Sequence, residues 1–548
     1  MKEDFVPYLP VVMGPILKAT IQEIQFTMVD VVEGEEEEEE NEDEDEGQTG
    51  GEERRTHTAV ISLGGGVRKR VTLNTFAVQQ KAQATRLIFE LGSVLKGRLS
   101  SFLLPTLEAL LPCLTDKHSA DIRSTASLAL AQVFAACIDA EQGDQKLPQA
   151  LNLPTILTFT VTKLLESLKG ENNASSRVSS AEALRDVLQA CHQSGTLQAD
   201  GSRLSPLCTL EISFAGNVVR ELMERCSESM KRRAALDKSG HHRQSSEAYE
   251  EAEEDEENEQ LEEEEECLSV LVDALGQVVK LQGEGIMPQM DSLVAPSFAS
   301  LLDLSQPEAL QLVGISLLDD LIEFGALSAC KYVPQAMPRF LQIMANKSPS
   351  LLMKQAASYG IAQSARRDPS SFAPFMTATL PLLYTVLQGL NKEEEDNQGT
   401  IENIIFAFSV IYCCPLYRGI DWGEVTPAMM ASIWMGHLPL QADEVEAKIT
   451  HHLFVDCVEK LDVNILGENH SNMSRVLTIF GELLFSIRNE EEEEDYDDYA
   501  LILPATAVRM KEVIVQIATS SSKDHFLQLL GTMQVEHRSL MVALFPGY

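Results

Sequence analysis

The sequence of 548 residues has few aromatic residues and no cysteine motif. Aromatics make up 6% of the chain, with two tryptophans, so the core must be built from Leu, Ala, Val, Ile and Met, which suits packed helices. The ten cysteines are scattered and include no Cys-x-x-Cys pair, which argues against a disulfide framework and for a reducing compartment. The first residues, Met1-Lys2-Glu3-Asp4, carry no signal peptide pattern, so we expect an intracellular protein.

Long hydrophobic runs are also lacking. The longest uncharged apolar stretch is identified near Ile404–Pro415, and a membrane-spanning helix needs about 20 such residues. We therefore predict a soluble chain without membrane insertion.

Positive charge is absent from three acidic runs. They are Glu33–Glu46 with 12 acids in 14 residues, Glu250–Glu266 with 13 in 17, and Glu490–Asp498 with 8 in 9. The formal net charge is −41, yet outside these runs 51 acidic residues face 43 basic ones. Phosphate binding needs a basic footprint, so the charge argues against nucleic acid and favours basic protein partners.

Motifs for catalysis, nucleotide binding or metal binding are absent as well. Gly64–Arg70 lacks the Gly-Lys-Ser/Thr ending of a phosphate loop. The adjacent pairs His241-His242 and His451-His452 point to different sides of a helix and cannot chelate as an i, i+4 pair does, so we interpret them as polar surface residues. No Ser/His/Asp or Cys/His arrangement can be argued. We expect no enzymatic activity, no cofactor and no metal.

Helical periodicity is what the sequence does have. Apolar residues recur every three or four positions in Ile122–Phe134 and again in Gly314–Phe324. No long region alternates with a period of two. The best strand candidate is Thr58–Leu63, followed by three glycines, which we assign to a loop or small hairpin within an insertion.

A short phrase, an aromatic or aliphatic residue followed closely by proline and an apolar helix, recurs along the chain. Pro288 and Pro334 are 46 residues apart, and Pro334 and Pro374 are 40 apart. Paired helices with this period are typical of HEAT or armadillo repeats, and an irregular α-bundle is the alternative. A second proline that would bend the first helix follows in the same phrases, at Pro10, Pro112, Pro338 and Pro381.

The second helix of a pair has its own signature. Asp116 and Asp121 precede one apolar helix, and Ser348-Pro349 precede another, where acidic or Ser side chains can cap the helix N-terminus. We therefore predict an all-α fold, an α-solenoid of HEAT/armadillo-like helical repeats with acidic insertions. The expected order is repeat helices over 1–30, a disordered acidic and Gly-rich insertion over 31–75, repeats over 76–245, an acidic segment leading into a long helix over 246–282, repeats over 283–488, an acidic loop over 489–499, and C-terminal helices over 500–548.

Several phrases together resemble one family, the importin β (karyopherin β) nuclear transport receptors of the importin-five, or Ran-binding protein five, type. The phrases are Glu3-Asp4-Phe5 with Leu9–Pro15, Gly314–Glu323, Ser348-Pro349 with Gln355–Ile361, Glu402-Asn403, Glu424–Pro427 with Leu438-Pro439-Leu440, and Val463–Asn472.

The resemblance implies a receptor that binds basic nuclear-localisation cargo, such as ribosomal proteins or histones. It also implies binding to phenylalanine-glycine nucleoporins, release of cargo by Ran-GTP, and shuttling between cytoplasm and nucleus through the nuclear pore. The chain is about half the expected length and corresponds to the C-terminal half, and the repeats that form the principal Ran-GTP site have no counterpart in it. Ran-GTP binding is therefore expected in a full-length context.

Candidate cargo contacts follow from residue type and from the resemblance. Trp422 could anchor a cargo side chain, with core packing as the alternative. Asn403 lies on a predicted inward-facing helix, where asparagines can bind an extended peptide. Lys231-Arg232-Arg233 is expected to balance local charge rather than act as a localisation signal. The Asp319-Asp320 pair could equally cap a helix or hydrogen-bond between repeats. The candidate set is Asn403, Glu402, Trp422, Asp319, Asp320, Glu253, Glu254, Asp255 and Glu256.

Two functions remain open at this point. One is a transport receptor that holds a basic signal on an acidic face. The other is a HEAT-repeat scaffold, adaptor or chaperone-like binder of basic proteins without a role in transport. Nucleoporin binding distinguishes them.

Overall fold

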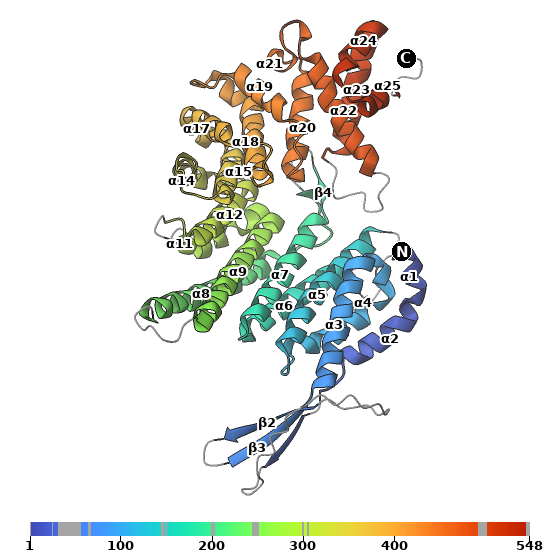
Figure 1. Ribbon diagram of the computed structural model, residues 1–548, viewed down its shortest axis with the longest axis vertical. Helices are drawn as coiled ribbons and strands as arrows, with labels where there is room; N and C mark the ends of the chain where they lie inside the picture. Colours follow the sequence, from blue (N-terminus) through green and yellow to red (C-terminus); the bar gives the residue numbers. More distant parts are fainter. Residues whose placement is uncertain are drawn as a thin grey trace. The chain divides into compact units, whose positions relative to one another are not determined.

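A computed structural model describes residues 2–24, 26–30, 56–63, 67–143, 147, 151–198, 203–243, 251–298, 301–303, 306–490 and 501–543. The chain divides into two compact units (Figure 1). Unit 1 comprises Met1–Ser194 and Leu207–Gln277, and unit 2 comprises Gly195–Pro206 and Val278–Tyr548.

Unit 1 is built from pairs of helices, with long second helices packed side by side. Neighbouring contacts join α3 to α5 and α5 to α7, and α6 packs on α7. The helices are α1 (Lys2–Phe5), α2 (Leu9–Thr20), α3 (Thr75–Leu95), α4 (Leu103–Leu110), α5 (Ala120–Gln142), α6 (Leu153–Gly170), α7 (Ala174–Gln193), α8 (Ile212–Arg243) and α9 (Glu251–Gln282), of which the last crosses into unit 2.

Asparagine and serine side chains cap the N-termini of α5, α6 and α7. Asn152 and Asn173 each accept a hydrogen bond from the backbone N–H three residues ahead, at the starts of α6 and α7. Ser119 caps α5, whereas the sequence favoured an acidic cap. Asp116 instead accepts from the backbone N–H groups of His118 and Ser119, which fixes the turn before the helix.

A small antiparallel sheet interrupts the helices of unit 1. Strand β2 (Thr56–Leu63) pairs with β3 (Val67–Asn74), and β3 pairs with β1 (Phe26–Asp30), in the order β1-β3-β2. The β2–β3 hairpin agrees with the strand candidate Thr58–Leu63. Strand β1 was not predicted, since helices were expected up to residue 30, and its partner is more than 40 residues away in sequence, where local periodicity gives no signal.

Unit 2 contains a two-stranded ribbon, β4 (Thr196–Leu197) with β5 (Arg203–Leu204), and the later helices. These are α10 (Met287–Gln289), α11 (Ala295–Phe298), α12 (Glu308–Phe324), α13 (Ala326–Ala329), α14 (Val333–Ala345), α15 (Leu351–Arg367), α16 (Pro369–Phe372), α17 (Met376–Gly389), α18 (Glu395–Cys413), α19 (Pro427–His437), α20 (Glu444–Glu459), α21 (Val463–Leu466), α22 (Met473–Glu490), α23 (Pro504–Ser520), α24 (Lys523–Leu529) and α25 (Val535–Ala543).

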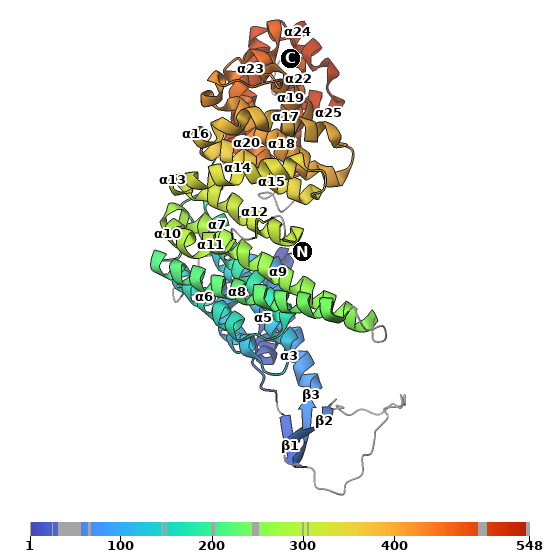
Figure 2. The same cartoon turned by 90° about the vertical axis from the view of Figure 1, so that its left-hand side faces the viewer.

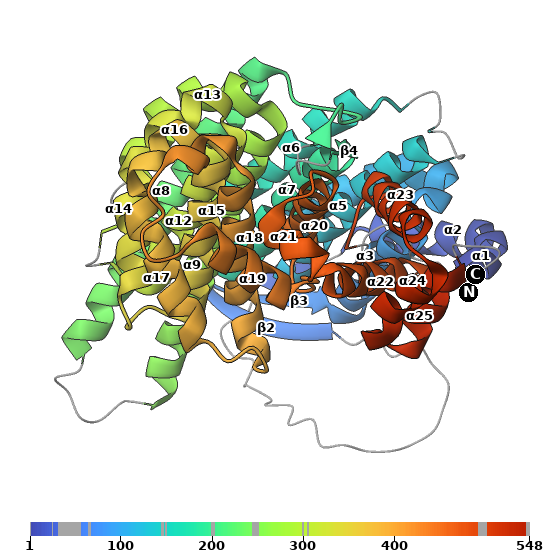
Figure 3. The same cartoon turned by 90° about the horizontal axis from the view of Figure 1, so that it is seen from above.

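The second helices of unit 2 follow one another as in unit 1. Figure 3 shows α12, α15, α18 and α20 in succession, and each packs on the next. Their buried sides are largely apolar, with Ile361, Phe406 and Phe454 fully buried, and also hold a few buried polar residues. This stacking of helix pairs is the HEAT-like α-solenoid architecture that the sequence predicted.

The prolines fall partly where they were expected. Pro338 and Pro381 lie inside α14 and α17, as predicted. Pro10 lies instead in the first turn of α2, where a missing N–H leaves no helical hydrogen bond unmade. Pro112 likewise starts a short 3-10 turn rather than bending a helix.

A longer uncharged run than Ile404–Pro415 exists, so that prediction was wrong. Residues Pro369–Gly389 have a mean hydropathy of 1.2 and are long and apolar enough to cross a membrane by length and composition alone. A 3-10 turn at Ala373–Phe375 divides the run, and both halves contact α14. Core helices of soluble proteins pass the same test, so the finding is weak evidence for a membrane span.

Candidate functional site

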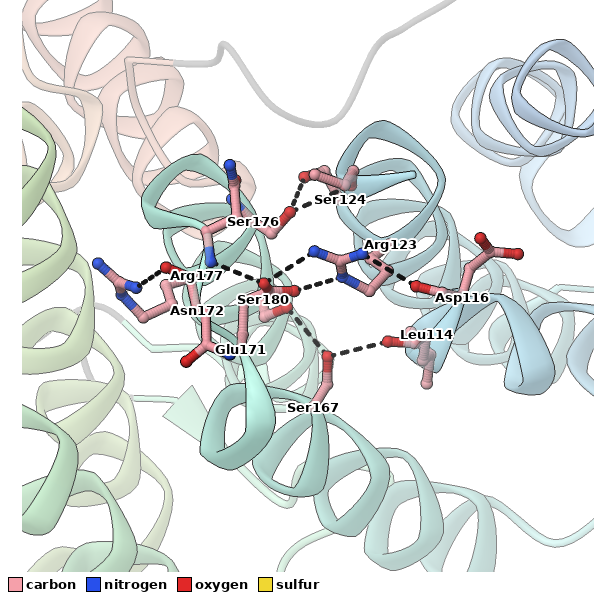
Figure 4. Close-up of polar contacts among 12 residues, drawn as sticks. Leu114, Asp116, Arg123, Ser124, Ser167, Glu171, Asn172, Ser176, Arg177 and Ser180 are labelled. Atoms are coloured by element: carbon pink, nitrogen blue, oxygen red, sulfur yellow. Dashed lines mark hydrogen bonds and ion pairs between the residues drawn. The ribbon is translucent and has the colours of Figure 1, made fainter. Parts of the chain in front are cut away.

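The polar junctions of unit 1 are built around Arg123, near the start of α5 (Figure 4). Its Nε and Nη2 atoms donate to the two carboxylate oxygens of Glu171, at 2.6 and 2.9 Å, and Nη1 donates to the Asp116 carbonyl at 2.9 Å. Lys81 on α3 donates to the Asp116 carboxylate at 2.8 Å. One chain of charge-assisted hydrogen bonds therefore links three successive repeats.

Small serine side chains bring α5 and α7 close together. Ser124 lies 2.9 Å from Ser176, and Ser127 lies 3.0 Å from Ser180, measured between hydroxyl oxygens (Figure 4). Ser180 also approaches Ser167 on α6, which donates to the Leu114 carbonyl. These hydroxyl groups are engaged in hydrogen bonds within the fold.

The acidic run of α9 is anchored to the body of unit 1. Figure 2 shows α8 and α9 side by side. Glu264 is buried and accepts hydrogen bonds from Arg177 on α7, from Arg232 at 2.7 Å and from Ser229 at 2.8 Å. Arg233 pairs with Glu265 at 2.9 Å. The prediction that the Lys231-Arg232-Arg233 cluster balances local charge is confirmed for its two arginines.

Glu263 of α9 lies in a more strongly acidic environment, although Arg177 also acts on it. Burial, then the nearby Glu259 carboxylate, raises the pKa of Glu263 above its ordinary value. Across from it on α7, burial raises the pKa of Glu182 against the lowering effect of Arg185, and the Asp186 and Glu266 carboxylates add to the rise. Carboxyl groups of α7 and α9 therefore repel one another on the surface of unit 1, which is the condition that a basic ligand would relieve. The predicted contacts Glu253, Glu254, Asp255 and Glu256 lie at the start of α9, where the structure describes the helix but not the side chains.

The predicted pair Asp319-Asp320 separates into two environments. Asp320 forms an ion pair with Lys280 at 3.0 Å, which joins α12 to α9 within unit 2. Asp319 is buried, and among the described residues none hydrogen-bonds to its Oδ1 atom. Burial, then the charges of Asp320 and Glu323, raises the pKa of Asp319 well above its ordinary value. A Cβ atom at Gly360 on α15 would collide with this carboxyl group, so glycine is what lets the two helices approach.

Glu323 joins the same helices one turn further on. It is buried and accepts hydrogen bonds from the Tyr359 hydroxyl and from Arg366 at 2.8 Å, both on α15. The guanidinium of Arg366 also lies 5.8 Å from the ring centroid of Phe406 on α18. The sequence analysis did not predict the pair of Glu323 and Arg366. The two residues are about one repeat period apart, and that spacing was the signal that could have identified them.

Glu402, Asn403 and Trp422 are engaged within the chain. Glu402 accepts from the backbone N–H groups of Gln441 and Ala442, at 2.7 and 2.8 Å. Asn403 donates to the Gln355 carbonyl at 3.2 Å, between α18 and α15. Trp422 is buried, and its Nε1–H donates to the Tyr417 carbonyl at 2.9 Å. Partner contact by these residues stays a prediction, and the roles that the structure shows are structural.

The interpretation of His451 and His452, both on α20, as polar surface residues is wrong for the first of them. His451 is fully buried rather than a surface residue, and burial lowers its pKa to about 4. His452 is half-buried beside Arg509. In the part of the chain that the structure describes, no group of three or more His, Cys, Asp or Glu residues could hold a metal ion. The arrangement as a whole supports binding of a partner through surface charge.

Several known proteins are similar to this chain in sequence or in fold. No family model matches the chain. Two curated relatives are a "Probable importin-5 homolog" of Dictyostelium discoideum, 28% identical over 178 residues, and "Importin subunit beta-3" of Saccharomyces cerevisiae, 24% identical over 487 residues. The alignments cover 32% and 87% of this chain, and only 16% and 38% of the relatives, so the chain spans less than half the length of either.

Solved structures of Kap121p share the fold. The structure bound to Ste12p has a TM-score of 0.66 at 17% identity, and the structure bound to RanGTP has 0.66 at 16%. The structure bound to Nup53p has 0.64 at 17%. Each match covers 99% of this chain and 42% or 43% of the solved one. The chain is thus similar in sequence to importins and has the fold of a karyopherin, as the resemblance to the importin β family implied.

Proposed function

We propose that the chain is part of an importin-type nuclear transport receptor that binds basic cargo proteins. The observation that carries the proposal is the sequence similarity to an importin β subunit over 87% of the chain, together with the HEAT-like architecture. The chain would act by binding alone and not as an enzyme. The curated relatives are longer, so this chain would supply cargo-binding repeats of a larger receptor and lack the main Ran-GTP site.

The distribution of charge supports a basic partner. The polar junctions of unit 1 compensate the buried carboxylates of Asp116, Glu171 and Glu264. Most of the excess negative charge lies in the three acidic runs, which hold 33 of the 84 acidic residues and no Lys or Arg. Surface charge of one sign steers an oppositely charged partner and raises its rate of association. Ribosomal proteins and histones are the basic proteins we propose as cargo.

Further partners are proposed by analogy with Kap121p, which has been solved with Nup53p and with RanGTP. We propose nucleoporin binding by this chain and shuttling between cytoplasm and nucleus, with Ran-GTP bound in a full-length context. A scaffold or chaperone-like binder of basic proteins is the second candidate, since the acidic runs would serve either role.

The test of cargo binding uses purified core histones and the full chain. Neutralising four acids of α9, in the variant Glu253→Gln, Glu254→Gln, Asp255→Asn and Glu256→Gln, should weaken histone binding severalfold with an unchanged thermal midpoint. The matched control neutralises four acids of another run, Glu35→Gln, Glu36→Gln, Glu37→Gln and Glu38→Gln. Equal weakening by both variants would indicate a general charge effect without a site, and no weakening by either would contradict cargo binding through the acidic runs.

Transport is tested separately from cargo binding. A receptor should bind a phenylalanine-glycine repeat fragment of a nucleoporin and accumulate in the nuclei of permeabilised cells. A chain that binds histones but neither binds the repeats nor enters nuclei would be a scaffold or chaperone-like protein, and the transport proposal would fail.

A further inference from the structure

A cavity of about 420 Å³ lies in unit 2, between α22 and α25. Its walls also include Leu501 and the loop that follows α19, through Pro439 and Gln441. Ligand sites in proteins have volumes of roughly 300–1,000 Å³, so this cavity can hold one large side chain together with some of its backbone. None of the functions assigned above uses it.

The walls are held in place by a buried histidine. His451 accepts a hydrogen bond from the Leu440 backbone N–H at its Nε2 atom, at 3.1 Å, and its Nδ1 atom lies 2.8 Å from the Leu501 carbonyl oxygen. Because Nε2 must accept, Nδ1 carries the proton and donates to Leu501. One neutral imidazole therefore ties together two wall segments that are about 60 residues apart in sequence.

Two further anchors fix the loop. Glu402 accepts from the backbone N–H groups of Gln441 and Ala442, and Arg475 donates to the carbonyl oxygens of Met435 and Leu438, at 3.1 and 2.6 Å. Glu402, a predicted cargo contact, thus acts in the structure as a positioning residue. A loop held by three independent side chains is a rigid wall, and rigid walls lower the entropic cost of binding.

The lining defines the ligand chemistry. Glu482 contributes a half-buried carboxylate, Gln441 and Gln534 contribute amide groups, and the described lining residues include no Lys or Arg. The rings of Phe485 and His537 lie together, with centroids 4.6 Å apart and planes tilted by 55°, and both line the cavity. The Nδ1 atom of His537 is buried and has no hydrogen-bond partner among the described residues.

These features fit a planar cation with several donors. A guanidinium group can pair with a carboxylate, donate to amide oxygens and stack on an aromatic ring at the same time. A lysine ammonium would pair with Glu482 but could not stack in this way. A phenylalanine side chain would leave Glu482 and the glutamine oxygens without partners, at the cost of desolvating them.

We propose that this cavity, formed by α22, α25, Leu501 and the Pro439–Gln441 loop, binds an arginine side chain of a partner polypeptide. The proposal rests on the proposed function for the class of partner, a basic protein, and it assigns one specific contact. The sequence outside the cavity favours a cation as well, since the chain between Ser486 and Leu501 carries the acidic run Glu490–Asp498.

The test uses a fluorescein-labelled nonapeptide of glycine and serine with two arginines, and matched peptides with two lysines or two phenylalanines. Fluorescence anisotropy with the full chain at low salt should show that the arginine peptide binds at least about fivefold more tightly than either of the others. Glu482→Gln should weaken its binding about tenfold or more, because a hydrogen bond to a charged group is lost. The control Glu512→Gln removes one exposed charge from α23, outside the cavity, and should change the affinity less than about twofold.

A second variant and a second readout locate the site. Phe485→Leu should abolish the preference for arginine over lysine while binding stays dependent on Glu482. Hydrogen exchange with the arginine peptide bound should show protection at residues 438–442 and 482–486. Tightest binding of the phenylalanine peptide, equal effects of Glu482→Gln and Glu512→Gln, or protection confined to other helices would overturn the proposal.

Histone binding by the same protein preparations separates this inference from the proposed function. If Glu482→Gln abolishes arginine-peptide binding and the chain fails to bind histones, the cavity assignment stands and the cargo proposal fails. If histones bind and the arginine peptide does not, the cargo proposal stands and the cavity assignment fails.

Discussion

Unit 1 and unit 2 stack helices in the same way and both pair buried carboxylates with arginines, as Glu323 and Arg366 do in unit 2, but unit 2 also buries carboxyl groups that are not fully paired. In unit 1 the buried carboxylates of Glu171 and Glu264 are paired with arginines from neighbouring helices. In unit 2 two buried carboxyl groups, those of Asp319 and Glu446, each keep an oxygen atom with no hydrogen-bond partner in the described parts of the chain. Unit 2 also buries His451 in its neutral form.

The difference shows that one repeat architecture tolerates two kinds of junction. A paired junction holds its charge, and although burial alone would raise the pKa of Glu171, hydrogen bonds from Arg123 and the backbone lower it. A buried carboxyl group without a full set of partners favours its neutral form, as at Glu446, where burial raises the pKa well above its ordinary value. The stability of unit 1 should therefore be sensitive to removal of one side chain of an ion pair, and the stability of unit 2 should be sensitive to a change of pH.

The largest effect is expected from Arg123→Ala in unit 1. Removing the guanidinium leaves the Glu171 carboxylate buried without its cation, which costs about 3–5 kcal/mol for a pair of this kind. The opening free energy of α5 and α7, from native-state hydrogen exchange, should fall by about that amount. The control Lys163→Ala removes an exposed i, i+3 pair with Glu166 and should cost less than about 1 kcal/mol. Similar losses in both variants would contradict the paired-junction description.

Acidification should weaken unit 2 through His451. Its pKa is about 4 in the fold and near 6.5 when unfolded, so the unfolded chain gains the proton first as the pH falls. The stability that the neutral imidazole gives is complete above about pH 6.5 and is lost towards pH 4, by up to about 3 kcal/mol. The opening free energy of α20, measured against His451→Gln over this range, should show the loss in the wild-type chain alone. Parallel curves would contradict it.

Asp319 should give the opposite pH dependence. Its raised pKa means that the folded state keeps a proton that the unfolded state releases, so its contribution is complete below the ordinary carboxyl pKa and is lost as the pH rises through the folded pKa. Relative to Asp319→Asn, α12 and α15 of the wild-type chain should therefore be less stable at pH 8 than at pH 5. The difference should be about 1.4 kcal/mol for each pH unit that separates pH 5 from the folded pKa. A wild-type chain that is as stable as the variant at both pH values would rule out a protonated Asp319.

The smallest effect is expected on the surface of α9. The Glu263 carboxylate is partly exposed, and Glu259 and Glu266 repel it more than Arg177 attracts it, so Glu263→Gln should stabilise unit 1 by a few tenths of a kcal/mol at low salt. The gain should vanish at high salt. Differential scanning calorimetry at two salt concentrations would detect it as a shift of the thermal midpoint, and a destabilised variant would show that Glu263 has a structural partner.

Much of the fold could be predicted from the sequence, because repeat architecture leaves a local trace. Helical periodicity and recurring prolines identified the HEAT-like helices, and the acid-rich residues before Cys267 were expected to start a long helix, which α9 confirms. Strand β1 was missed because its partner β3 lies far along the chain. The extent of the run at Pro369–Gly389 was also overlooked.

The candidate site could be predicted less well. Residue type pointed to Glu402, Asn403 and Trp422, but burial and hydrogen bonding within the chain depend on packing between repeats. The cavity at Glu482 and Phe485 was not foreseen, since its walls come from segments far apart in sequence that His451 brings together.

Carboxylates without an internal cation are the groups that we assign to partner binding, and salt tests that assignment most directly. The affinity of the full chain for core histones should be measured by fluorescence anisotropy from 50 to 300 mM NaCl. Because exposed charges are screened beyond about 8–10 Å at physiological salt, we predict a loss of affinity of about tenfold or more over this range. An affinity that stays constant within about twofold would contradict an electrostatic mode of cargo binding.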